Sequence, residues 1–227
     1  SQAVARLAWS REQVLEEQTR RLRKIVAHAQ QTSPFHAARL GHLEATTLQL
    51  SDLSKIPPLT KDDVMTNWDR VVTDSRLRLA DVNAHLNRVL SGEEPNAYYL
   101  DEYYAAATGG SSGKRGLFLW DWETIVVTAN IACRMEAQQD LAEPSTGPKR
   151  TAVICAGSYV HGSRFLFPVV LDPQREVLVL PASLAISKMV EQLNDFQPDR
   201  IISYSALLEE LCAEALDGRL KIKPQRL

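Results

Sequence analysis

The chain has 227 residues, of which 44% are hydrophobic and 24% are charged, and its formal net charge is -2. This length and composition predict a globular protein with a sizeable core. Because positive and negative charges nearly cancel, the overall charge favours neither nucleic acid nor an anionic membrane surface as a partner. No apolar run approaches the roughly 20 residues of a transmembrane helix, and the N-terminus lacks the layout of a signal peptide. We therefore expect a cytoplasmic protein.

The three cysteines, Cys133, Cys155 and Cys212, lie far apart and form no C-x-x-C pair. This spacing argues against a zinc site and against a disulfide framework, so no metal site is predicted. Each cysteine sits among apolar neighbours, which predicts buried free thiols.

Residues 1–96 are predicted to form a mainly helical region. A first helix is expected over Ser10–Gln31, where apolar residues recur at helical spacing between charged residues. Its apolar stripe comprises Val14, Leu15, Leu22, Ile25, Val26 and Ala29. The sequence T-S-P-F at 32–35 ends this helix and begins a second, and Thr60 is the expected N-cap of a third helix after I-P-P-L.

Residues 97–121 are predicted to form a small antiparallel sheet. Short β-type runs occur at Tyr98–Leu100, Tyr103–Ala107 and Leu117–Asp121. A glycine-rich loop separates the last two runs.

Residues 122–227 are predicted to form an α/β region. Asp121 is expected to cap a helix that reaches about Leu141. The apolar stripe of this helix comprises Trp122, Ile125, Val126, Ala129 and Cys133. Three apolar runs follow: T-A-V-I-C-A, E-V-L-V-L-P and R-I-I-S-Y. Helices are predicted over Ser183–Phe196 and Ala206–Leu216. Continuous apolar runs suit strands buried on both faces, which predicts a parallel sheet with right-handed crossovers.

The two ends of the chain carry a further expectation. The sequence opens at Ser1 without a methionine and closes on L-K-I-K-P-Q-R-L, an alternating pattern that predicts the beginning of a strand. We therefore expect a fragment whose α/β region is truncated at its C-terminus.

The loop T-G-G-S-S-G-K at 108–114 is the strongest candidate for a ligand site. Its members are the glycines Gly109, Gly110 and Gly113, the hydroxyl residues Thr108, Ser111 and Ser112, and Lys114. Glycines let backbone amides approach a ligand closely, and the hydroxyls and the ammonium group add donors and positive charge. These groups together suit a polyphosphate.

Other interpretations of the loop remain open. It fails the Walker pattern G-x-x-x-x-G-K-[ST] twice, because Thr108 stands at the first glycine and Arg115 follows the lysine. G-G-S-S-G fits the nucleophile elbow of serine hydrolases, with Ser111 as nucleophile. The elbow requires a helix directly after it, whereas R-G-L-F-L-W-D-W alternates like a strand. The loop could also be a hairpin connection that binds nothing.

T-G-G-S-S-G-K between two strands resembles the phosphate loop of the adenylate-forming superfamily, whose usual form is [ST]-S-G-[ST]-[ST]-G-K-P. Within it, the chain resembles the phenylacetate-CoA ligase and coenzyme F390 synthetase branch. The supporting segments are L-R-K-I-V-A-H-A-Q-Q-T-S-P-F-H at 22–36, I-P-P-L-T-K-D-D-V at 56–64, P-A-S-L at 181–184 and L-N-D-F-Q-P-D-R-I-I-S-Y at 193–204. Gly109 replaces the usual serine and Arg115 the usual proline.

The resemblance implies that the chain is part of the large N-terminal domain of an adenylate-forming enzyme. Thr108–Lys114 would hold the β and γ phosphates of ATP while a carboxylate oxygen attacks the α phosphate. The acyl adenylate would then form a thioester, so ATP, Mg²⁺, coenzyme A and a small carboxylic acid are the implied cofactors and partners. Tyr159 and His161, in G-S-Y-V-H-G, would lie beside the acyl group.

The resemblance also implies what this stretch of chain lacks. The family's adenine-binding segment, ribose-binding aspartate and catalytic lysine would lie beyond Leu227. No catalytic residue is therefore assigned, and the isolated chain is expected to have little or no activity. A non-catalytic module of the same fold that forms homodimers or binds a partner is the alternative. Tyr159 and His161 would then be ordinary polar groups on a surface turn.

Overall fold

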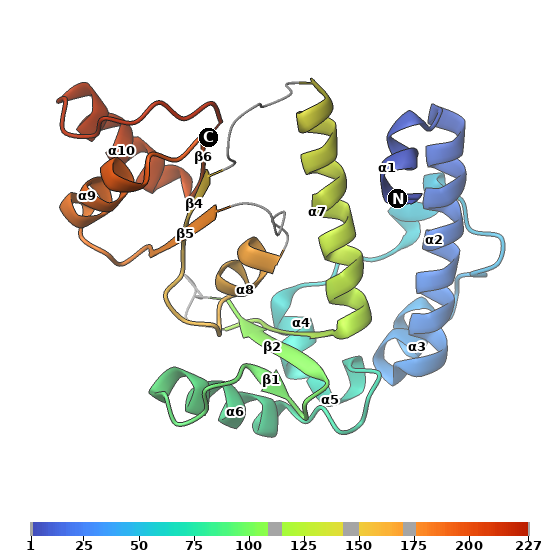
Figure 1. Ribbon diagram of the computed structural model, residues 1–227. Coiled ribbons are helices and arrows are strands. Elements are labelled where there is room, and N and C mark those ends of the chain that lie inside the picture. The colour runs from blue at the N-terminus through green and yellow to red at the C-terminus, as the bar shows by residue number, and fades with distance from the viewer. Residues whose placement is uncertain (1, 109–114, 143–149, 170–175, 227) are drawn as a thin grey trace. The chain divides into compact units, whose positions relative to one another are not determined.

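The computed structural model describes residues 2–108, 115–142, 150–169 and 176–226. The chain divides into two compact units, Ser1–Asn87 and Arg88–Leu227. Its fold is α/β, with helices, a small antiparallel sheet and a parallel sheet, as the sequence predicted (Figure 1). The predicted three-part division at residues 96 and 121 stays a prediction. Within the described ranges, no helix combines the length and the apolar character that crossing a membrane requires.

The first unit is helical. Its elements are α1 (Gln2–Ala5), the 3₁₀ helix η1 (Arg6–Ala8), α2 (Arg11–Thr32), α3 (Pro34–Leu40), the 3₁₀ helix η2 (Leu50–Lys55), α4 (Lys61–Thr66) and α5 (Trp68–Val71), and α6 (Leu79–Ser91) begins in it. Ser10 is the N-cap of α2 and Thr60 is the N-cap of α4, and each forms a reciprocal capping box with the residue three positions later. Ser33 caps α3, with Pro34 at its first position. The three predicted helices are thus confirmed, whereas α6 was not predicted.

A small core holds the first unit together. It comprises Val26, Leu40, Leu43, Ala45 and Leu48. The side-chain amide of Gln30 donates hydrogen bonds to the carbonyls of Leu40 and Leu43, at 2.8 and 2.9 Å. Ile25 was placed in the apolar stripe of α2, but its side chain is 65% exposed. That prediction was wrong because this core covers a narrower face of the helix than the stripe implies.

The antiparallel sheet lies in the second unit. Its order is β1 (Tyr98–Tyr99), β2 (Tyr103–Ala107) and β3 (Leu117–Asp121), and both pairings are antiparallel. The predicted bounds of β2 and β3 are confirmed. Leu100 and Asp101 leave β1 because both have a φ of 57°, the left-handed conformation of a tight hairpin turn. The Glu102 amide donates to the Tyr99 carbonyl and closes this turn.

Helix α7 (Trp122–Ala142) follows β3. The Asp121 carboxylate accepts a hydrogen bond from the Thr124 amide at 2.7 Å, as predicted for the N-cap. Within the predicted apolar stripe, Ile125 is buried against Tyr104, whereas Trp122 is 63% exposed and Cys133 is also exposed. Val126 is 40% exposed as well, so the stripe prediction was wrong for Trp122, Val126 and Cys133. Helical spacing shows which residues share a face, but it does not show that another element covers that face.

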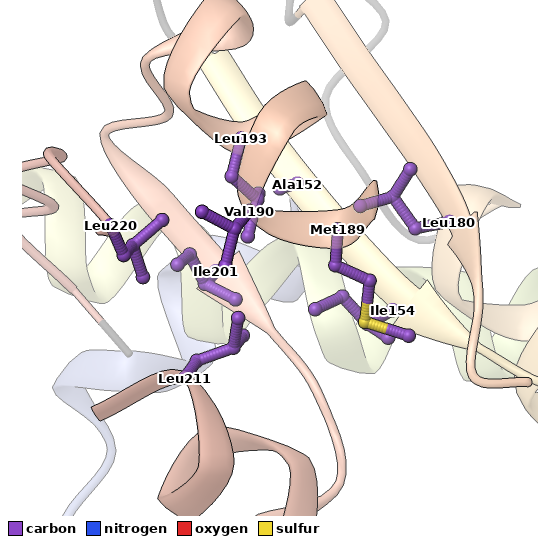
Figure 2. Close-up of a cluster of buried hydrophobic side chains, with 9 residues drawn as sticks. All are labelled: Ala152, Ile154, Leu180, Met189, Val190, Leu193, Ile201, Leu211 and Leu220. Atoms are coloured by element: carbon purple, nitrogen blue, oxygen red, sulfur yellow. The ribbon is translucent and has the colours of Figure 1, made fainter. Parts of the chain in front are cut away.

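The parallel sheet forms the rest of the second unit. Its order is β5 (Glu176–Pro181), β4 (Arg150–Cys155) and β6 (Arg200–Ile202), and the helices are α8 (Gly162–Val169), α9 (Ile186–Phe196) and α10 (Ser205–Leu216). Both neighbours pair in parallel with β4, as predicted. Helices α9 and α10 pack on the same face, and Figure 2 shows the core between them and the strands. This core comprises Ala152, Ile154, Leu180, Met189, Val190, Leu193, Ile201, Leu211 and Leu220.

Three sequence predictions need correction in this region. The segment 220–226 is not a strand, since it makes only an isolated parallel bridge between Arg226 and Arg200. Helix α8 was not predicted. Cys155 is buried as expected, but Cys133 and Cys212 are exposed because they lie on uncovered faces of α7 and α10; all three thiols are free.

Candidate functional site

The base of the glycine-rich loop is closed by two hydrogen bonds. The Thr108 amide donates to the Gly116 carbonyl, and the Gly116 amide donates to the Thr108 hydroxyl, both at 2.9 Å. The predicted phosphate-binding residues Gly109, Gly110, Ser111, Ser112, Gly113 and Lys114 lie outside the described residues. Thr108, through its two hydrogen bonds to Gly116, has a structural role that the sequence did not indicate. Its oxygen accepts a bond that closes the loop, and among the described residues no acceptor is found for its own proton.

The segment with the predicted acyl-pocket residues is attached to the same strand. The Ala107 amide donates to the Val160 carbonyl at 2.8 Å, one residue before Thr108. The Tyr104 hydroxyl donates to the Tyr159 carbonyl. The structure thus places Tyr159 and His161 in a segment that lies beside the base of the glycine-rich loop.

Aromatic stacking fixes Tyr104 in position. Its ring stacks on Phe165 of α8, with centroids 3.8 Å apart, and on Trp120 of β3 at 5.9 Å. Tyr104 is 1% exposed, and burial raises the pKa of its hydroxyl well above the usual range. The hydroxyl therefore stays protonated at physiological pH and continues to donate to the Tyr159 carbonyl.

Tyr159 and Arg164 form a pair at the surface of this segment. The Tyr159 side chain is 48% exposed, and the guanidinium carbon of Arg164 lies 4.9 Å from its ring centroid. This geometry is a cation–π contact. The Ser158 carbonyl accepts from the His161 amide, and the His161 carbonyl accepts from the Arg164 amide. The backbone of His161 thereby connects the loop to the first turn of α8.

The ends of two neighbouring strands meet at this place. Ser163, shortly after β4, shares a 2.8 Å hydrogen bond with the hydroxyl of Tyr204, which follows β6. At the end of β4, burial raises the pKa of the Cys155 thiol, and the nearby Arg164 opposes that shift. Neighbouring residues of a strand point to opposite faces of the sheet, and the Ile154 side chain faces α9 and α10. Cys155 therefore points to the other face, and Arg164, which is near its thiol, lies on that face too.

Strand order makes this edge a topological switch point. After β4 the chain passes through α8 to β5 on one side, and after β6 it passes through α10 to Arg226 on the other side. Ligands of open α/β sheets bind in the crevice that such diverging connections leave at the carboxyl ends of the strands. Ser163, Arg164 and Tyr204 occupy this edge with Tyr159. The sequence signal was weak, since these three residues are only polar side chains close after apolar strands.

In the described ranges, no group of three or more histidine, cysteine, aspartate or glutamate residues could hold a metal ion.

The sequence matches no protein-family model and no curated protein. Solved structures do match. An open conformation of 2-hydroxyisobutyryl-CoA ligase in complex with 2-HIB-AMP and CoA gives a TM-score of 0.58 at 15% identity, covering 91% of this chain and 44% of that chain. The same ligase in the postadenylation state with 2-HIB-AMP gives 0.62 at 14% identity, covering 92% and 40%. This chain therefore spans less than half the length of those structures, and over that span its fold is similar to that of 2-hydroxyisobutyryl-CoA ligase.

Proposed function

We propose that the chain is the N-terminal part of an ATP-dependent carboxylate-activating enzyme of the phenylacetate-CoA ligase branch. In the first step a carboxylate oxygen attacks the α-phosphorus of ATP and displaces pyrophosphate. In the second step the thiol of coenzyme A, as thiolate, attacks the acyl carbon and displaces AMP. The fold similarity supports this class of chemistry, and the motifs at 22–36 and 56–64 favour the branch.

The observation that carries the proposal is the hydrogen bond between the Ala107 amide and the Val160 carbonyl. Acyl adenylate formation joins the acid to the α phosphate, so the acyl pocket and the triphosphate loop must be neighbours. The segment with Tyr159 and His161 lies beside the base of the Thr108–Lys114 loop, as this reaction requires. A loop that served only as a hairpin connection would not need that neighbour.

Each site residue has a distinct role in the proposal. Thr108–Lys114 hold the β and γ phosphates, with the Thr108 proton as one donor and Lys114 as the neutralising charge. Tyr159 and His161 line the acyl pocket. Mg²⁺ would enter with the ATP phosphates. A cytoplasmic location and a homodimer stay predictions.

The direct test is ATP–pyrophosphate exchange with a panel of aryl and alkyl carboxylates, using the longest natural version of the chain. We expect exchange with at least one acid, and no exchange with any acid would contradict the proposal. Ser111→Ala and Lys114→Ala should each lower the exchange rate about 100-fold or more. Their free energies of unfolding should change by less than about 0.5 kcal/mol. A loss of stability in proportion to the loss of exchange would show that the loop is structural.

The fold argues against the serine hydrolase alternative. The elbow motif requires a helix after Ser111, whereas Leu117–Asp121 form strand β3, antiparallel to β2. A fluorophosphonate probe should therefore leave Ser111 unlabelled.

The non-catalytic module has one observation in its favour, the exposed apolar side chains Trp122, Val127 and Ile131 on α7. Calorimetry with ATP or pyrophosphate separates the two candidates, because a pure scaffold should bind neither.

A further inference from the structure

Arg164 is a half-buried cation whose purpose the proposed reaction does not explain. Its guanidinium lies over the Tyr159 ring, and one of its nitrogens is 3.5 Å from the Tyr159 hydroxyl, a long contact. A guanidinium has five N–H donors; within the described residues, Arg164 uses one toward the Tyr159 hydroxyl and another toward the Cys155 thiol, which leaves others for a ligand. Within the described ranges, no carboxylate forms an ion pair with Arg164.

Other arginines of the same unit behave differently. Arg150, on β4, pairs with Glu176 at 2.9 Å, and Arg219 pairs with both Glu214 and Asp217. Arg150, whose side chain is 32% exposed, shows the ordinary arrangement, in which a cation partly removed from water has a carboxylate partner; Arg219 is mostly exposed. Arg164 is held instead by an aromatic face, which positions the charge without neutralising it. The switch point at the ends of β4 and β6 is where a ligand would reach that charge.

We propose that Arg164 binds an anionic group of the acyl substrate, so that the preferred acid carries a second acidic group besides the carboxylate that reacts. This inference rests on the proposed function. The reacting carboxylate is a poor partner for Arg164, since it loses its charge on forming the anhydride with AMP. A cation paired with it would stabilise the ground state more than the transition state. A second carboxylate keeps its charge throughout, so its pairing with Arg164 assists binding at every stage.

The expected size of the effect follows from the chemistry of the pair. Bidentate, charge-assisted bonds between arginine and carboxylate are about twice as strong as neutral ones. An acid that lacks the second group leaves the guanidinium unpaired. We therefore expect preferences on the order of 10- to 100-fold in kcat/KM.

The test uses matched pairs of acids, glutarate against pentanoate and terephthalate against benzoate, in ATP–pyrophosphate exchange by the longest natural version of the chain. In at least one pair the diacid should have the higher kcat/KM by about 10-fold or more. Arg164→Gln should bring that ratio to about 1, chiefly by raising KM for the diacid. Arg164→Lys keeps the positive charge but cannot bind a carboxylate through two parallel hydrogen bonds, so it should give an intermediate ratio. Arg88→Gln, which removes the same charge from an exposed position of this unit, should keep the wild-type ratio.

Two results would overturn the inference while leaving the proposed function intact: the wild type prefers the monoacid in both pairs, or Arg164→Gln lowers the activity with both members of each pair equally. If no acid supports exchange, the proposed function fails, and calorimetry with glutarate and terephthalate decides the inference separately. Diacid binding that Arg164→Gln abolishes would support the anion site. No diacid binding would overturn it.

Discussion

The two three-stranded sheets of the second unit differ in what they contribute to the protein. In the parallel sheet, Thr151–Cys155 of β4 are fully buried, and the polar residues of interest lie beyond the strand ends. In the antiparallel sheet, Tyr104 is buried, but Phe118 on the neighbouring strand is 48% exposed, and the candidate loop joins β2 directly to β3. The parallel sheet therefore provides most of the core, whereas the antiparallel sheet positions a loop. Stability and activity should respond to different substitutions.

The largest effect should come from the core of the parallel sheet. Ile154→Ala removes a fully buried side chain packed among α9 and α10, and it should lower the free energy of unfolding by about 3–4 kcal/mol. Urea unfolding followed by circular dichroism measures this loss. Val177→Ala, at a partly exposed position of β5, is the matched control and should cost less than about 1 kcal/mol. Similar losses in both variants would contradict the conclusion that the parallel sheet provides most of the core.

The contact between the two sheets should give the next largest effect. Tyr104→Phe keeps the stacking on Phe165 but removes the hydrogen bond to the Tyr159 carbonyl. We expect a loss of about 1–2 kcal/mol in stability. Amide exchange in the segment 157–161 should also become faster. An unchanged exchange rate there would mean that Tyr104 does not hold this segment.

The end of β3 should give a smaller, pH-dependent effect. Asp121→Ala removes the N-cap of α7 and should cost about 0.5–1 kcal/mol at pH 7. Hydrogen bonds from Thr124 lower the pKa of Asp121 below its ordinary value of 3.8. The stabilisation is therefore complete above pH 3.8 and is lost as the pH falls through the lowered pKa. Thermal unfolding of both proteins at several pH values should converge under acid conditions, and a constant difference would contradict this account.

The smallest effect is expected on the open face of α7. Trp122 is 63% exposed, so Trp122→Ala should change the free energy of unfolding by no more than about 0.5 kcal/mol. A loss above about 1 kcal/mol, or one that depends on protein concentration, would show that this face is covered in solution. That outcome would favour the partner-binding alternative.

The sequence was most informative where local pattern determines the structure. A continuous apolar run predicted β4 as a buried parallel strand, and short β-type runs on either side of a glycine-rich loop predicted β2 and β3. The parallel pairing of β5 was also predicted, but its burial on both faces was not borne out, because Glu176 and Val177 are exposed. Helix α8 was missed because it is short and because Phe165 on it packs against Tyr104, a long-range contact that no local pattern reveals. Arg164 and Tyr204 were not recognised as neighbours of the site, because strand order brings them there.

The central claim is that the loop between β2 and β3 and the segment after β4 form one ligand site. Amide hydrogen exchange of the longest natural chain, with and without ATP, tests it most directly. The account predicts that the Ala107 and Gly116 amides exchange slowly before ATP is added, because both are hydrogen-bonded. It also predicts that ATP slows exchange in 109–114 and in 157–161 together. Slowing in neither segment, or in 109–114 alone, would contradict it.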